Sequence, residues 1–419
     1  MIQLLKPKSE FNRNILTLMT GSTIANAIPV AISPILTRIY SPEDFGLLAL
    51  FLSVTTIFGT IVNGRYELAI MLPKKDEDAI NIVALGFIIM SLITLILFVI
   101  VIIFNEKIVH LLSNNDIGTW LYIVPLSIFL IGLFNLLNYF NNRKKHYKDI
   151  AKANIIKSIT MVVFQIVVGY LREGAAGLIS GQVASQMTAN MKLLKNIIKN
   201  KLLLSKISKK KILQVAKRYK EFPKFSIAGA LANKATGNLT NILISIFYNV
   251  STLGFYSLVQ RVLGVPSALI GNSIGQVFFE EASKEKQLTG KAVKVFKSTV
   301  KKLFIIGTPS FGILFFIVED LFAFVFGEEW RVAGGYARIM IPVFFIGFIV
   351  STVSIVDSIF EKLFFYLCLQ IGYLVSMMIA LYLFKNYQFE NLLIIIAIIS
   401  CIHYLLHFIG LVFFVNGKG

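Results

Sequence analysis

The chain has 419 residues, of which 56% are hydrophobic and only 15% are charged. Soluble domains carry charges at about a quarter of their positions, so this balance excludes an ordinary soluble enzyme or binding domain and predicts an integral membrane protein. The formal net charge of +19 suggests either nucleic acid or a membrane surface as a partner, and the positions of the basic residues decide between them.

Apolar stretches long enough to cross a bilayer recur along the whole chain. A bilayer core of about 30 Å takes roughly 20 apolar residues in a helix. We therefore predict an all-α integral membrane protein with twelve transmembrane helices. The predicted spans are 14–36, 45–64, 79–104, 120–140, 155–171, 174–194, 224–248, 252–278, 303–326, 337–356, 362–384 and 391–415.

The basic residues follow the topology of these spans. If the N-terminus is cytoplasmic and each span crosses once, most of the 41 Lys and Arg residues fall in cytoplasmic segments. This is the positive-inside bias, and it predicts that both termini are cytoplasmic. The net charge is thereby explained without a nucleic-acid partner.

A basic connection divides the chain into two halves. Residues 192–224 contain twelve Lys or Arg residues and separate two groups of six spans. We predict an N-terminal six-helix bundle over 1–198, a basic cytoplasmic linker over 199–222 and a C-terminal six-helix bundle over 223–419. Because six is even, both halves start from the same side, so they are expected to be parallel repeats with a substrate site between them near the midplane.

An offset of 208 residues aligns the two halves. It pairs Tyr40 with Tyr248 and Gly46 with Gly254, between apolar helices on both sides. In the first copy, residues 41–44 (Ser-Pro-Glu-Asp) predict a helix start, with Ser as the N-cap, Pro in the first turn and acids near the positive end of the helix dipole. We predict an external tight turn here and an equivalent turn at 249–252.

Polar residues form stripes along four predicted spans. On span seven, Lys234, Asn238 and Asn241 are separated by four and three residues, which places them on one helical face. Span eight carries Arg261 in a similar stripe from Gly254 to Gly275, and span two carries a stripe that runs to Glu67. At the offset of 208, Asn26 and Ser53 of the first half correspond to Lys234 and Arg261.

Two cations are thus predicted near mid-membrane depth. An uncompensated cation there costs at least about 2.5–3.5 kcal/mol, so each needs a cavity, a partner or an anionic ligand. Spans one, seven and eight contain no acid to serve as that partner. We expect a cationic cavity for an anion, since Arg and Lys both suit phosphate oxygens; the alternative is that both cations bond to backbone carbonyls in a packed bundle. The predicted cavity residues are Lys234, Arg261, Asn26, Asn238, Asn241 and Ser53.

Glu67 ends the stripe on span two and is a candidate for binding a coupling proton or cation. A solvated or ion-paired residue at the end of a span is the alternative. Arg65 is expected to point to the opposite face as an interfacial anchor. Asp357 and Glu361, at the end of span ten, are weaker coupling candidates.

The sequence gives no basis for a metal or a cofactor. His403 and His407 have the spacing of two helical metal ligands, but they lack an HExxH motif and a carboxylate on the same span, so we expect them to hydrogen-bond within the bundle. No GxxxxGK[ST] motif occurs, and no catalytic triad or carboxylate pair can be defended. The sequence therefore predicts a transporter and not an enzyme.

Two stretches of the chain resemble a known family. Residues 34–51 (PILTRIYSPEDFGLLALF) and 64–79 (GRYELAIMLPKKDEDA), with a weaker match at 326–342, are similar to bacterial polysaccharide repeat-unit flippases. These are the O-antigen and capsule transporters of the multidrug/oligosaccharidyl-lipid/polysaccharide exporter superfamily. Length, twelve spans and the six-plus-six repeat agree with this family along the whole chain.

The resemblance implies a fold like that of the multidrug and toxin extrusion (MATE) transporters and movement by alternating access. The expected substrate is an undecaprenyl-pyrophosphate-linked oligosaccharide, moved from the cytoplasmic to the outer leaflet of the bacterial cytoplasmic membrane. Related flippases line their cavity with cations, for which Lys234 and Arg261 are the counterparts here by position and chemistry. The protein is expected to act as a monomer that can assemble with polysaccharide polymerase and export proteins.

Other functions remain open at this stage. A cation-coupled multidrug exporter of the same superfamily would be expected to have an acid within span one, which is absent here. A flippase for lipid-linked peptidoglycan precursors usually has two more spans. A membrane polysaccharide polymerase generally has a large external loop, whereas the external stretches around 105–119 and 327–336 are short.

Overall fold

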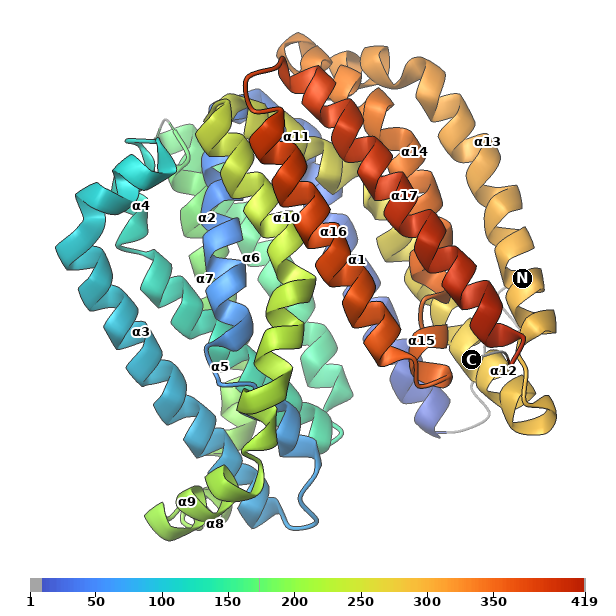
Figure 1. The fold of residues 1–419 in the computed structure, drawn as a ribbon. Coiled ribbons are helices and arrows are strands. Elements are labelled where there is room, and N and C mark those ends of the chain that lie inside the picture. The colour runs from blue at the N-terminus through green and yellow to red at the C-terminus, as the bar shows by residue number, and fades with distance from the viewer. Residues whose placement is uncertain (1–9, 173, 418–419) are drawn as a thin grey trace. The chain divides into compact units, whose positions relative to one another are not determined.

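The computed structural model describes residues 10–172 and 174–417. Every regular element in these two ranges is helical, and they contain no strand (Figure 1). The prediction of an all-α fold is confirmed.

The chain packs into two compact units. The N-terminal unit comprises the residues up to Ile32 together with Leu50–Lys234, and the C-terminal unit comprises Ser33–Ala49 together with the chain from Ala235 onward. The end of the first helix and the start of the second therefore pack with the second half of the sequence. The boundaries proposed for the two repeats, around the linker 199–222, remain a prediction about the duplication.

The helices of the first half follow one another with short connections. They are α1 (Glu10–Ile39), α2 (Pro42–Ile61), the 3-10 helix η2 (Tyr66–Met71), α3 (Asp76–Leu112), α4 (Ile117–Leu121), α5 (Val124–Arg143), α6 (Tyr147–Leu171), α7 (Ala176–Ile198), α8 (Lys201–Leu204), α9 (Lys209–Arg218) and the π-helix η3 (Phe222–Ser226).

The second half repeats this arrangement of long helices. They are α10 (Ile227–Phe247), α11 (Val250–Leu263), the π-helix η4 (Ser267–Gly271), α12 (Asn272–Thr289), α13 (Val293–Phe326), the 3-10 helix η5 (Glu328–Trp330), α14 (Arg331–Val353), α15 (Val356–Ile359), α16 (Leu363–Leu383) and α17 (Phe389–Val415).

Nine segments of the described chain are long and apolar enough to cross a membrane. They correspond to nine of the twelve predicted spans. The other three predicted spans contain α7 and α10, which are more polar, and α11, which has only 14 residues. Two of these, α10 and α11, carry the predicted cations.

The aligned glycines of the two repeats meet each other. A Cβ built on Gly46 would lie 1.8 Å from the carbonyl oxygen of Val250, and one built on Gly254 would lie 1.7 Å from that of Pro42. Residues 42 and 250 are themselves equivalent at the offset of 208, so the contact is reciprocal. Helices α2 and α11 cross at a point where any side chain would collide with backbone, which explains why both positions are glycine.

The starts of these two helices are also equivalent. The Ser41 hydroxyl accepts a hydrogen bond from the Asp44 N–H, and the Asp44 carboxylate accepts one from the Ser41 N–H. At the matching position, the Asn249 side chain accepts from the Thr252 N–H at 2.7 Å. Both predicted tight turns are present, each with a capping side chain that satisfies a backbone donor of the first turn, and their external location remains a prediction.

The predicted span over 252–278 is broken, contrary to its treatment as one helix with one stripe. Helix α11 ends at Leu263, a π-helical turn follows at Ser267–Gly271, and α12 begins at Asn272. The break coincides with Gly264 and Pro266. Proline has no N–H to donate and collides with the preceding turn, so the helix cannot continue unchanged.

The basic linker forms two short helices that pack on the start of α3. The Lys211 ammonium pairs with the Glu77 carboxylate at 2.7 Å, and the Asn81 side chain donates to the Lys206 carbonyl and accepts from the Ser208 N–H. Ser208 in turn caps α9. In Figure 1, α8 and α9 lie beside the end of α3 that carries these residues.

Candidate functional site

Arg261 lies in the last turn of α11, in the C-terminal unit. Its guanidinium carbon is 5.6 Å from the centroid of the Phe45 ring, a cation–π contact worth about 0.5–2 kcal/mol. Its Nη1 atom is buried and has no hydrogen-bond partner among the described residues. A buried cationic donor without an acceptor is costly, and an anionic oxygen would satisfy it.

Packing around Phe45 fixes the position of Arg261. The Phe45 ring meets the fully buried Trp330 edge-on at 5.0 Å, and Phe255 meets Trp330 from α11 at 5.7 Å. The Trp330 indole donates to the Thr37 carbonyl. Arg261 is seven residues after Gly254, so it lies two turns along α11 on the face where α2 crosses.

The three polar residues of predicted span seven lie on consecutive turns of α10, as their spacing predicted. Lys234 is exposed, and Asn238 and Asn241 are half-buried. Lys234 is the last residue of the N-terminal unit, whereas the two asparagines belong to the C-terminal unit.

The two neutral counterparts of the cations differ in accessibility. Asn26 is exposed on α1, so a ligand could contact its amide. Ser53 is only 1% exposed on α2 and is packed among other side chains. In this conformation, therefore, Ser53 lines no open surface, and its role as a cavity residue remains a prediction.

Glu67 does not extend the stripe of α2, contrary to the prediction. Helix α2 ends at Ile61, and Gly64 and Arg65 then adopt positive φ values before η2 begins at Tyr66. The turn reverses the chain and places Glu67 inside the N-terminal unit, where it is 2% exposed.

Arg65 faces Glu67 and is not an anchor on the opposite face. Its Nη1 atom lies 3.1 Å from Glu67 Oε1. Glu67 Oε2 is buried and has no hydrogen-bond partner in the described part of the chain. Burial raises the pKa of the Glu67 carboxyl, and its own backbone hydrogen bond and the charge of Arg65 oppose this shift. A buried carboxyl with a raised pKa and one free oxygen is suited to binding a proton or a small cation.

The predicted hydrogen bonding of the span-twelve histidines is confirmed for His407. Its Nε2 lies 2.7 Å from Asp357 Oδ2. His403 stacks on the Tyr373 ring at 4.3 Å. Among the residues searched, no group of three His, Cys, Asp or Glu side chains could hold a metal ion. Glu361 is exposed in the turn after α15 and lies outside this buried cluster.

A comparison with protein-family models identifies the family. The model described as "Polysaccharide biosynthesis protein" matches residues 35–334, which include Glu67, Lys234 and Arg261. The chain belongs to this polysaccharide biosynthesis family. A search of curated protein sequences found no match.

Solved structures share the fold of this polysaccharide biosynthesis protein. It is similar to the lipid II flippase MurJ in an inward closed conformation, with a TM-score of 0.74 and 14% identity over 94% of this chain and 87% of that one. It is also similar to an inward-facing multidrug resistance MATE transporter of the MOP superfamily, with a TM-score of 0.58 and 11% identity over 95% and 93% of the two chains. The protein therefore has a MurJ-like and MATE-like helical fold and is a multi-pass membrane protein.

The sequence did not predict two contacts of this polysaccharide biosynthesis protein, the Arg65–Glu67 ion pair and the buried hydrogen bond between Asp357 and His407. The Arg65–Glu67 pair depends on the turn at Asn63-Gly64, a dipeptide that commonly marks a turn and that could have ended the predicted helix. The Asp357–His407 pair joins residues fifty positions apart, and no local pattern predicts it.

Proposed function

We propose that this protein is a flippase for undecaprenyl-pyrophosphate-linked oligosaccharide repeat units. It moves them by alternating access from the cytoplasmic to the outer leaflet, for O-antigen, capsule or related polysaccharide biosynthesis. It acts as a transporter and catalyses no covalent step.

The geometry of Arg261 carries this proposal. A pyrophosphate oxygen is the acceptor that its buried Nη1 lacks, and the planar guanidinium suits phosphate through paired hydrogen bonds. Lys234 supplies a second, exposed cation, and the amides of Asn26, Asn238 and Asn241 are suited to hydrogen-bonding a glycan. Membership of a polysaccharide biosynthesis family supports a carbohydrate-containing substrate.

The proposal includes a topology and partners. The protein lies in the bacterial cytoplasmic membrane with both termini in the cytoplasm, as the distribution of its basic residues favours. It works as a monomer, and polysaccharide polymerase and export proteins are its candidate partners. Glu67 is the candidate coupling group in the N-terminal unit.

Deletion of the gene in its host bacterium tests the proposal. The lipid fraction is analysed by mass spectrometry, and leaflet exposure is measured with a membrane-impermeant lectin or glycosidase. We expect complete repeat units to accumulate in the cytoplasmic leaflet, inaccessible to the external probe, and the wild-type gene to restore access.

Two results would favour other functions. Unchanged exposure of lipid-linked glycans combined with increased sensitivity to cationic drugs would indicate a multidrug exporter. Repeat units that reach the outer leaflet but stay unpolymerised would indicate a polymerase.

A further inference from the structure

Asp357 and His407 form a buried pair of ionisable side chains in the C-terminal unit. Asp357 lies in α15, the short helix between α14 and α16, and His407 lies on α17. Each is only 4% exposed, and the Asp357 Oδ2 to His407 Nε2 distance is 2.7 Å. A hydrogen bond of this length between buried groups requires a proton between the two atoms.

The second oxygen of Asp357 is also buried but has no partner. No hydrogen bond reaches Oδ1 within the described part of the chain. With neutral His407, the pair carries one negative charge in a poorly solvated place, which is unfavourable. With His407 protonated, the pair is neutral overall. The surroundings therefore make the charge of this pair sensitive to a single proton.

The groups around the pair do not supply a compensating charge. From α16, the Tyr366 ring is 5.7 Å from the His407 ring, and from α17, the His403 ring is 6.3 Å from it. On α14, which also packs against α17, the ionisable side chains lie only between Arg331 and Arg338, at the end opposite α15.

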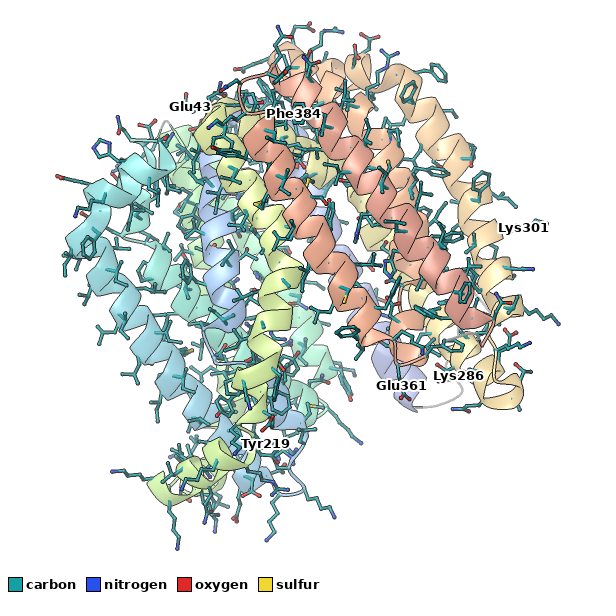
Figure 2. The ribbon with its side chains drawn as sticks, viewed as in Figure 1. Glu43, Tyr219, Lys286, Lys301, Glu361 and Phe384 are labelled. Carbon is teal, nitrogen blue, oxygen red and sulfur yellow. The ribbon has the colours of Figure 1, made fainter. Side chains whose placement is uncertain are left out.

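Cations lie in the turn after α15 and on α12 and α13. The Lys362 backbone N–H donates to the Asp357 carbonyl at 2.7 Å, and its ammonium is 5.8 Å from the centroid of the Phe414 ring. The Lys286 ammonium donates to the Ile359 carbonyl at 2.6 Å, next to the Asp357 helix. Lys297 and Lys301 line an apolar groove of about 550 Å³ that also includes Phe408, the neighbour of His407. Figure 2 shows Lys286 and Glu361 near α15, at one end of the unit, with Glu43 and Phe384 at the other end.

Polar groups continue from this pair along the seam between α16 and α17. His403 precedes His407 by one helical turn and stacks on Tyr373, whose hydroxyl lies 2.9 Å from the Ser400 hydroxyl. The rest of α17 is almost entirely apolar. Polar groups on a membrane-spanning helix cost free energy unless they interact with one another or bind a proton.

We propose that Asp357 and His407 form a proton-binding site in the C-terminal unit. With neutral His407, its Nε2–H donates to the Asp357 carboxylate. A proton from solvent binds the lone pair of His407 Nδ1, and the resulting imidazolium keeps its Nε2–H donated to the carboxylate. Loss of that proton returns the imidazole to its neutral form and leaves the carboxylate charged. Because Asp357 lies in α15, which connects α14 to α16, the change of charge acts on this connection. The use of this proton to drive transport rests on the proposed function, whereas its binding does not.

Nuclear magnetic resonance of the full-length protein in detergent tests the site. The chain has only four histidines, so ¹⁵N-labelled ring signals can be assigned with single His→Gln variants. We expect the ring signals of His407 to respond to pH in a way that depends on the Asp357 carboxylate. In Asp357→Asn this response changes, because the carboxylate no longer stabilises the imidazolium. His110 on α3 serves as the control, and its signals respond to pH in the same way in both proteins.

Two outcomes would overturn the site. One is a His407 ring that keeps a single protonation state from pH 5 to pH 9, as a permanent structural ion pair would. The other is a response to pH that is the same with and without the Asp357 carboxylate. If Asp357→Asn does not fold, Asp357→Glu replaces it, and an unchanged response in that variant also overturns the site.

Transport in proteoliposomes separates this inference from the proposed function. We expect an imposed pH gradient to change the rate of movement of an undecaprenyl-pyrophosphate-linked oligosaccharide in the wild type and not in His407→Gln. A His407 that titrates with Asp357 in a protein that moves no such lipid would refute the flippase and leave the proton site standing. Transport that ignores the pH gradient, with a His407 that does not titrate, would refute only the site.

Discussion

At the scale of single residues, Arg261 distinguishes an anion-binding site from a packed bundle. If Arg261 were only structural, its donors would be expected to bond to backbone carbonyls, yet Nη1 has no partner among the described residues and the aromatic Phe45 covers the guanidinium. The arrangement leaves one donor available for an incoming oxygen. This is the geometric difference between the two readings of the sequence.

Arg261→Ala is expected to reduce transport roughly 10- to 100-fold, because a hydrogen bond from a charged group is worth about 1.5–3 kcal/mol. Arg261→Lys retains the charge but not the planar guanidinium, so its transport rate should lie between those of the wild type and Arg261→Ala. The assay is transport of the lipid-linked oligosaccharide at matched protein level in the membrane. Arg338→Ala is the control, since Arg338 is exposed and paired with Glu319. Wild-type rates for Arg261→Ala would refute the anion site.

Lys234→Gln tests the second cation independently. We expect transport to fall while the amount of folded protein is unchanged, because Lys234 is exposed and its removal leaves no buried gap. The rate is measured at increasing substrate concentrations, so that weaker binding can be told apart from slower movement. An unchanged rate at every concentration would remove Lys234 from the site.

The raised pKa of Glu67 predicts that the free energy of unfolding depends on pH. Because burial raises its pKa, the folded chain holds this proton at a pH where the unfolded chain, with an ordinary Glu pKa of about 4.3, has lost it. The stability contributed by the protonated carboxyl is therefore complete at low pH and is lost as the pH rises through the raised pKa. Glu67→Gln lacks this titration.

The melting temperatures of wild type and Glu67→Gln are compared in detergent from pH 4 to pH 8. The wild type should lose stability relative to the variant as the pH rises. A constant difference between the two proteins would mean that Glu67 does not titrate in this range, and a difference of opposite slope would mean that its pKa is lowered.

At the scale of helices, the crossing of α2 and α11 is the most constrained contact found. Gly254→Val places a side chain where the Pro42 carbonyl already lies, so we expect a loss of at least about 1–3 kcal/mol, the usual cost of overpacking. Thermal unfolding in detergent measures it. Gly372→Ala in α16 is the control, because nothing lies within 4 Å of its added Cβ. Equal melting temperatures for both variants would contradict the close crossing.

Much of the helical framework could be predicted because its signals are local. Apolar runs located the long helices, including those that contain α10 and α11, and the Ser41 cap located a turn. The break after Leu263 coincides with Gly264 and Pro266, which disfavour a continuous helix, but the predicted polar stripe continued across it. The predicted span 45–64 ends close to the end of α2 at Ile61, but the predicted stripe ran on to Glu67, beyond the Asn63-Gly64 turn.

The candidate site was less predictable, for a physical reason. Helical spacing predicted that Lys234, Asn238 and Asn241 share a face of one helix, as they do on α10. It cannot say what a side chain meets on another helix. Contacts such as Arg261 with Phe45, Arg65 with Glu67 across a reversed turn, or Asp357 with His407 depend on how distant segments pack.

At the scale of the whole molecule, family and fold indicate different levels of function. The family match places the protein in polysaccharide biosynthesis, and its fold is shared with a lipid II flippase and a multidrug resistance transporter. Neither names the transported molecule. The buried, partnerless donor of Arg261 adds the chemical preference for an anion, which connects the two in the proposal of a pyrophosphate-linked substrate.

Flipping in a purified system tests that proposal most directly. Full-length protein is reconstituted into liposomes that contain an undecaprenyl-pyrophosphate-linked oligosaccharide, and an added glycosidase cleaves only the glycans on the outer leaflet. With wild-type protein, we predict that cleavage proceeds beyond the half of the glycans that is exposed at the start. With empty liposomes, cleavage stops at that half. The extent of cleavage with Arg261→Ala should be far closer to that of empty liposomes than to that of the wild type. Cleavage that stops at the exposed half with correctly folded wild-type protein, with or without a pH gradient, would contradict it.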